Sequence, residues 1–239
     1  MQSQISEQIE ILRCAQAADD IDHAVDALAK HGECAMPCLL EATKAIPASK
    51  MLRSRFIQAI RKIGYPSNCT ALPILVCTAA NINAPSNVLA IETLKEIGTP
   101  AIPQIRETLR FYSHGECQDA PAVDSLCSLL AVLGSPVIDT LLPELLELLE
   151  REDSWFDLAA IAPLGVIGSP KANDAVRILQ RKILDGSKTQ GVRKAAIDVL
   201  DKFDPLAVRP VAGALRTCLS DKSEPIRSSA KKMLAWLGQ

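Results

Sequence analysis

The stretch AIETLKEIGTPAIP, residues 90–103, carries the pattern that decides the fold. Its apolar residues recur every three or four positions up to Leu94 and Ile97, which places them on one face of a helix. Gly98 is suited to the position after a helix, and Pro100 prevents the helix from continuing. The chain then reads alanine, an apolar residue and proline, which is typical of the first turn of a second helix.

The same phrase recurs along the chain. In each copy, one residue directly follows the expected second helix, and we call this residue the marker. The markers are Gly32, Gly64, Gly98, Gly134, Gly168, Asp204 and Gly238. The spacings are 32, 34, 36, 34, 36 and 34 residues, and a fixed period in this range is the signature of repeat architectures. The pattern predicts about seven two-helix units in one domain, 1–239. Their approximate bounds are 1–32, 33–64, 65–98, 99–134, 135–168, 169–204 and 205–238.

Each unit repeats one apolar stripe. Counted back from the seven marker positions, minus eight and minus four are apolar throughout, and minus one is apolar in all but the first unit. These offsets lie on one helical face. Minus eight is alanine in most units, which lets neighbouring helices approach closely: Ala24, Ala90, Ala160, Ala196 and Ala230. The alternation typical of strands is absent, so the predicted fold class is all-α.

This frame of Ala-apolar-Pro and Leu-x-x-Ile-Gly resembles the HEAT-repeat superfamily, in particular its short bacterial branch with the phycobilisome-lyase-type repeats. The resemblance covers nearly the whole chain. It implies an armadillo-like α-solenoid whose second helices line a concave face, with each unit burying its apolar face only against its neighbours. The frame is structural, so it specifies a fold and leaves the activity open.

Groove-facing side chains are expected on the second helices at positions minus eleven, minus ten, minus six, minus three and minus two. These positions are mostly apolar in the fourth and fifth units, with one aspartate in each (Asp124 and Asp157), and mostly charged in the second and sixth. Together with Trp155, the candidate partner-binding residues are Arg53, Arg61, Val123, Val132, Leu158, Ala162, Val166, Arg193, Lys194, Lys202 and Arg227. Two interpretations stay open: an exposed apolar patch, or a helical phase shifted by one position that puts these side chains in the core. Pro163 predicts a kink or break in the fifth second helix.

Charge is divided unevenly along the chain. Residues 1–170 carry 12 basic and 21 acidic side chains, whereas residues 171–239 carry 14 and 7, and the net charge is -2. The balance argues against membrane surfaces and against lengthwise tracking of nucleic acid, and it favours an acidic protein partner. The basic end is either a solvated surface or an anion-binding end built on Arg193, Lys194, Arg227, Lys231 and Lys232.

No constellation of catalytic residues stands out. The tetrapeptide His-Gly-Glu-Cys occurs at 31–34 and 114–117, in turns that a solenoid places on opposite edges, so neither a metal nor a cofactor is predicted. The segment 154–157, Ser-Trp-Phe-Asp, is similar to the aromatic segment of HEAT-like alkylpurine DNA glycosylases. The resemblance requires an acid one helical turn after the aromatic residue, and that position holds Ala160. Trp155 and Phe156 are instead expected to pack between units four and five or to anchor a partner.

We therefore expect a non-catalytic scaffold or adaptor that binds a helix or peptide of another protein in its groove. The resemblance implies an alternative, a phycobilin-lyase-like chaperone that handles a tetrapyrrole on a phycobiliprotein, and nucleic-acid binding or glycosylase-like activity is a lesser alternative. A polar N-terminus without a signal peptide, the absence of a long apolar run and the use of eight cysteines predict a cytoplasmic protein. Pairing with a second copy or with another solenoid is left open.

Overall fold

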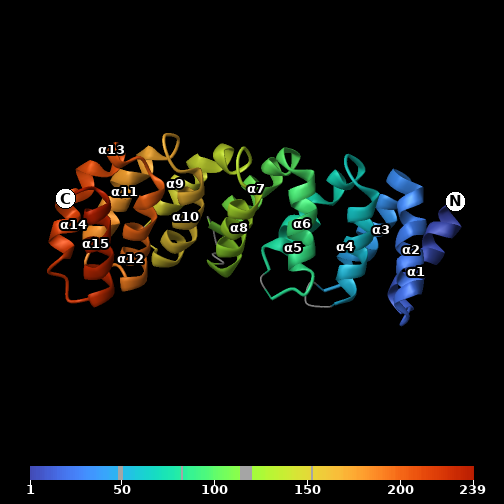
Figure 1. Cartoon of the computed structure of the whole chain (residues 1–239). Helices are drawn as coiled ribbons and strands as arrows, with labels where there is room; N and C mark the ends of the chain where they lie inside the picture. Colours follow the sequence, from blue (N-terminus) through green and yellow to red (C-terminus); the bar gives the residue numbers. More distant parts are fainter. Residues whose placement is uncertain (48–50, 82, 114–119, 152) are drawn as a thin grey trace. The chain divides into compact units, whose positions relative to one another are not determined.

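The computed structural model describes residues 1–47, 51–81, 83–113, 120–151 and 153–239. Every regular element in these ranges is a helix, which confirms the all-α prediction (Figure 1). Contacts between Cα atoms divide the chain into two compact units, Met1–Phe111 and Tyr112–Gln239. Within the described ranges, no helix has the length and apolar character needed to cross a membrane.

The first unit is built from helical hairpins. Helix α1 packs on α2, α3 on α4 and α5 on α6, while α1, α3 and α5 form one row and α2, α4 and α6 another. Short 3-10 turns lead into several of the helices. The elements are α1 (Gln2–Cys14), α2 (Ala18–His31), η1 (Gly32–Ala35), α3 (Met36–Lys44), α4 (Leu52–Ile63), η2 (Ser67–Ala71), α5 (Leu72–Ala79), α6 (Asn87–Ile97), η3 (Thr99–Ala101) and α7 (Ile102–Ser113), which reaches the boundary between the units.

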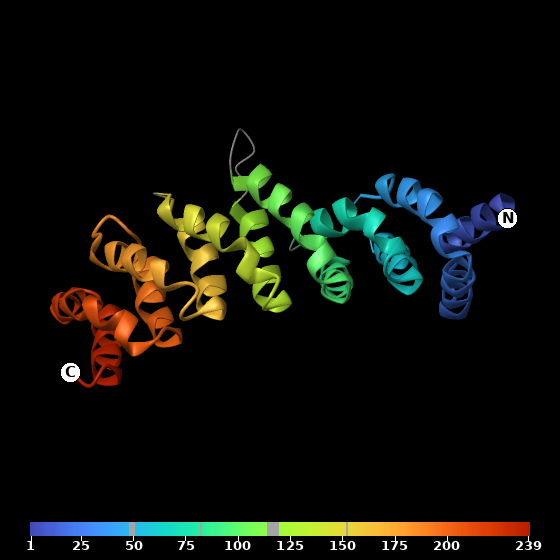
Figure 2. The same ribbon diagram turned by 90° about the horizontal axis from the view of Figure 1, so that it is seen from above.

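The second unit follows the same plan. Helices α8, α10, α12 and α15 pack in one row, and α9, α11 and α14 pack in the other. Figure 2 shows the hairpins of each unit following one another in chain order. The elements are α8 (Ala120–Leu133), η4 (Ile138–Leu141), α9 (Leu142–Glu150), α10 (Ser154–Ile167), α11 (Asn173–Leu184), α12 (Gln190–Asp198), η5 (Val199–Lys202), α13 (Pro205–Val208), η6 (Arg209–Val211), α14 (Ala212–Cys218) and α15 (Glu224–Trp236).

The apolar stripe read from the sequence is the core of both units. All seven residues at minus eight and all seven at minus four are buried. Removing one leucine or isoleucine side chain from water contributes about 1.5–3 kcal/mol, so the repeated pair holds neighbouring hairpins together. The alanines at minus eight are fully buried, which confirms that they lie where helices meet.

Prolines occupy the places that the sequence predicts, with one exception. Pro37, Pro73 and Pro103 lie in the first turns of α3, α5 and α7. Pro163 lies inside α10, which continues to Ile167, so the predicted break in this helix is wrong. Proline removes one hydrogen bond. Packing of α10 between α8, α9 and α12 offsets that loss.

The glycines that end the second helices have positive φ angles, between 54° and 78°. Gly168 is the most constrained of them. Its φ is 59°, and a Cβ atom built there would lie 2.9 Å from the backbone oxygen of Lys202. Any larger residue would therefore be strained by its backbone conformation and would also push α10 away from η5.

We expect Gly168→Ala to lower the free energy of unfolding by more than Gly64→Ala. Both changes force alanine into a positive φ with ψ near 180°, a conformation essentially restricted to glycine, which costs about 1–3 kcal/mol. Gly64 has no atom within 4 Å of the added Cβ, so only Gly168→Ala also creates a clash. Urea titration measures both variants. Gly186→Ala, at an open position without a positive φ, is the control, and equal losses for Gly168→Ala and Gly186→Ala would contradict the expectation.

Candidate functional site

In α8 and α10, three of the five offsets expected to face outward are exposed, one is half-buried and one is buried. In α8 both, and in α10 at the same offsets, the residues at minus six and minus two are exposed, and those at minus three are half-buried. Minus eleven is different. Val123, at that position in α8, is fully buried, so its prediction as a groove residue is wrong. The reason is helical geometry, because minus eleven precedes minus eight by three residues and shares its face.

Helix α10 presents a continuous apolar line to solvent. Trp155 is 71% exposed, Leu158 38% and Val166 50%, and Ala162 between them is also exposed. Their spacings of three, four and four residues place them on one face, which we name the α10 stripe (Trp155, Leu158, Ala162 and Val166). The one charged residue of α10 is Asp157, and it is fully buried. The outer face of this helix therefore carries no charge.

Helix α8 extends the apolar surface. Val132 is 49% exposed and occupies the same repeat position in α8 as Val166 occupies in α10, and the two helices pack side by side. Exposure of Val132, Leu158, Ala162 and Val166 confirms that these residues lie outside the core. Of the two interpretations that the sequence leaves open, the exposed apolar patch is therefore the one that the structure supports for these four residues.

The corresponding face of the first unit is charged and internally paired. Arg61 of α4 bonds Glu92 and Glu96 of α6, with its Nε atom 2.9 Å from Glu96. These hydrogen bonds raise the pKa of the Arg61 guanidinium. Arg53 is half-buried, and burial lowers the pKa of its guanidinium. Neither arginine belongs to the unit that carries the α10 stripe.

The charged candidates of the second unit are also bonded within the chain. Arg193 donates to the Ile183 carbonyl at 2.9 Å and to Asp221 at 2.7 Å. Arg227 donates to the Asp221 backbone oxygen at 2.7 Å. These two arginines therefore hold the corner at Asp221, between α14 and α15, rather than forming an open anion site. Lys194 pairs with Asp198, and Lys202 with Asp201 at 3.3 Å, while Lys231 and Lys232 are exposed.

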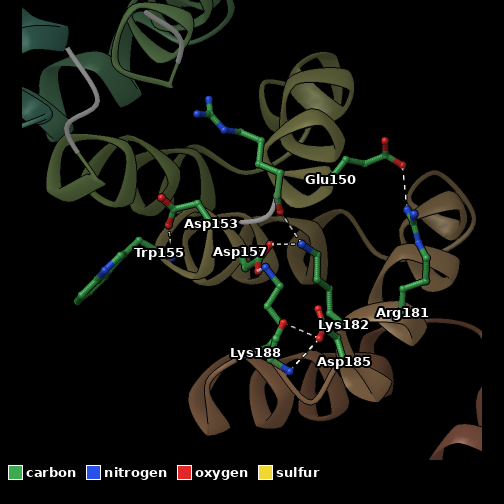
Figure 3. A network of polar contacts seen from close by, with 10 residues as sticks. Glu150, Asp153, Trp155, Asp157, Arg181, Lys182, Asp185 and Lys188 are labelled. Carbon is green, nitrogen blue, oxygen red and sulfur yellow. Dashed lines mark hydrogen bonds and ion pairs between the residues drawn. The ribbon is translucent and has the colours of Figure 1, made fainter. Parts of the chain in front are cut away.

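Beneath the stripe lies a buried ion cluster that the sequence analysis missed. Lys182 Nζ lies 2.7 Å from Asp157 Oδ1, and Lys188 Nζ lies 3.2 Å from Asp157 Oδ2. All three side chains are at most 8% exposed. Lys182 also donates to the backbone oxygen of Arg151 at 2.6 Å (Figure 3). The periodicity could have placed Asp157 inside, but its lysines come from 25 and 31 residues downstream.

The start of α10 separates the two aromatic residues. The Asp153 side chain accepts a hydrogen bond from the Trp155 backbone N–H at 2.8 Å, which caps the helix. Phe156 is buried, and the guanidinium of Arg151 lies 4.6 Å from the centre of its ring. The two aromatic residues therefore differ. Phe156 packs in the interior, as one of the two expectations states, whereas Trp155 faces solvent.

No residue of the cluster is placed for the chemistry considered from the sequence. Ala160, where the glycosylase resemblance requires an acid, is buried, and both oxygens of Asp157 face lysines. In the part of the chain that the structure describes, no group of three or more His, Cys, Asp or Glu could hold a metal ion. The second His-Gly-Glu-Cys, at 114–117, lies outside the described residues.

Comparison of the sequence with protein-family models gives no match, and a search of curated proteins finds no significantly similar sequence. The interpretation of the site therefore depends on the geometry of the chain itself.

We expect Asp157→Asn to destabilise the second unit strongly. The change removes the carboxylate that Lys182 and Lys188 both contact in the interior, and breaking a buried pair in this way costs about 3–5 kcal/mol. Asp198→Asn is the matched control, because the Lys194–Asp198 pair is exposed and such pairs contribute about 1 kcal/mol or less. Urea unfolding measures both. A loss for Asp157→Asn as small as that for Asp198→Asn would show that the cluster does not stabilise the fold.

The hydrogen bonds at Asp221 predict that the free energy of unfolding depends on pH. Hydrogen bonds from the Ser223 backbone and then from Arg193 hold the pKa of Asp221 below its ordinary value of 3.8. A lowered pKa stabilises the fold above the unfolded-state value, and the contribution is lost as the pH falls through the folded-state value. The gap in unfolding free energy between wild type and Asp221→Asn should therefore shrink between pH 6 and pH 3. Denaturant titrations at both pH values measure it, and a constant gap would contradict the assignment.

Proposed function

We propose that the chain is a non-catalytic adaptor that binds an apolar helical segment of another protein along the α10 stripe and Val132. The observation that carries the proposal is the uncharged outer face of α10, with Trp155, Leu158 and Val166 exposed in one line. Contiguous exposed apolar surface commonly marks an interaction site, and helices bind such surfaces through residues spaced three and four apart. We further propose that the hairpins form a HEAT-like solenoid and that the protein acts in the cytoplasm.

The chemistry of the partner follows from the surroundings of the stripe. The charges on the neighbouring α12 and η5 are already paired, Lys194 with Asp198 and Lys202 with Asp201. A partner with strongly charged side chains at the centre of its contact face would lose hydration without gaining an ion pair. An apolar face is therefore the better complement, and charges at its margin would mainly adjust specificity and association rate.

Trp155 is the natural anchor of this surface. Tryptophan is enriched among residues that carry most of the binding energy, because its large side chain buries much area for few rotatable bonds. Leu158 and Val166 would add the aliphatic contacts on either side of Ala162, where the small side chain lets a partner helix approach.

The test is a pair of charge insertions. Val132→Glu with Val166→Glu should leave circular dichroism unchanged, because both side chains are about half exposed. The pair should abolish capture of the stoichiometric protein partner that wild type retains from native lysate at moderate salt. Leu206→Glu is the matched control, since Leu206 of α13 is 75% exposed but lies off the stripe.

A direct contact completes the test. A photo-crosslinking amino acid at Leu158 should join the partner through a helical segment, and the same group at Leu206 should not. Capture that survives the double substitution, or a captured nucleic acid or coloured small molecule in place of a protein, would overturn the proposal.

A further inference from the structure

The exposed Trp155 depends on the backbone beneath it for its direction. With 71% of its surface in solvent, the side chain has little packing of its own. Its position is set by the first turn of α10, where the Trp155 N–H bonds the Asp153 carboxylate and the Asp157 N–H bonds the Asp153 carbonyl at 3.0 Å. Whatever fixes this turn therefore fixes the anchor.

Lys182 contacts the chain both within that turn and just before it. Reaching from α11, its Nζ contacts Asp157 Oδ1 at 2.7 Å and the Arg151 carbonyl at 2.6 Å. Asp157 follows Trp155 by two residues, and Arg151 precedes it by four, so one ammonium group joins backbone before the helix to a side chain within it (Figure 3). The Lys182 side chain is 8% exposed, so water weakens these contacts less than it does at the surface.

The composition of the cluster points to orientation as its role. One buried carboxylate contacts two buried ammonium groups, and taking charged groups out of water is costly. Well-packed apolar residues of similar volume often stabilise a fold as well as a buried ion pair does. What apolar residues would not supply is the hydrogen bond to the Arg151 carbonyl together with the ion pair with Asp157.

We propose that Lys182 is a positioning residue, which clamps the first turn of α10 through Asp157 and the Arg151 carbonyl and so presents Trp155 as a preformed anchor. The consequence for binding rests on the function proposed above, whereas the clamp itself is a property of the free protein. Preorganisation reduces the entropy lost when a side chain is immobilised in an interface.

The clamp is tested in the free chain with Lys182→Met. A Trp236→Phe background leaves Trp155 as the one tryptophan. Lys182→Met keeps the Asp157–Lys188 pair, so the protein should fold. We expect faster depolarisation of Trp155 fluorescence and roughly tenfold faster hydrogen exchange at the amides of Trp155 and Asp157, because local opening becomes easier.

Leu179→Ala is the control for stability alone. Leu179 is fully buried on the same helix as Lys182, and its truncation creates a cavity without touching the clamp. At temperatures well below unfolding, this variant should keep wild-type Trp155 depolarisation. Matching behaviour of Lys182→Met and Leu179→Ala would overturn the proposal, because the lysine would then contribute stability and no orientation.

A second variant covers failure of Lys182→Met to fold. The triple change Asp157→Leu, Lys182→Met and Lys188→Met removes every buried charge of the cluster and replaces it with apolar volume. We expect a folded protein with a mobile Trp155. Wild-type order of Trp155 in this folded protein would also overturn the proposal.

Binding separates the clamp from the proposed function. With the partner captured by the α10 stripe, Lys182→Met should weaken affinity by about 2- to 10-fold, mainly through faster dissociation. If Trp155 becomes mobile in Lys182→Met but the wild-type chain captures no partner, the adaptor function is contradicted and the clamp is supported. If Trp155 keeps its wild-type order in Lys182→Met and the partner still binds through the α10 stripe, only the clamp is contradicted.

Discussion

The constraint on which the structure depends is burial of the apolar stripe at positions minus eight and minus four of the second helices. Both positions are buried in every repeat. Because each hairpin buries this stripe against its neighbours, one face of each second helix is left without an intramolecular partner. The same constraint that builds the fold therefore creates a row of free helical faces, and their composition decides what the protein can bind.

The free faces differ between helices. On α4, Arg61 is bonded to two glutamates of α6, so that surface is polar and internally satisfied. On α10, the side chains that face solvent are apolar, and the single carboxylate points inward to two lysines. Burial of Asp157 thus has two effects, since it adds an ion cluster to the interior and it removes charge from the outer face. An apolar docking surface requires the second effect.

A structural feature can be predicted from this sequence when it depends on spacing within one helix. The marker glycines, the first-turn prolines and the minus eight and minus four stripe follow from spacing within one helix, and the structure confirms them. Assignment of Val123 to the outer face was an error of local geometry that helical spacing could have corrected. Helical spacing places Lys182 on the buried face of α11 with Ile178 and Leu179. The pairing of Lys182 and Lys188 with Asp157, however, depends on tertiary packing, which spacing within one helix does not specify. Continuity of α10 through Pro163 likewise depends on the helices packed around it.

The proposed anchor, Trp155, and the buried ion cluster are connected through the first turn of α10. An exposed tryptophan on a frayed helix start would have to be ordered each time a partner bound, and fraying is common where the first amides lack acceptors. Here the Asp153 carboxylate satisfies the Trp155 amide, and Lys182 ties both ends of the turn to α11. The hydrogen bond to the Arg151 carbonyl and the ion pair with Asp157 restrain the backbone from which Trp155 projects, a restraint that apolar residues of similar volume would not supply. The buried ion cluster and the exposed apolar stripe therefore lie on opposite faces of the same helix, α10.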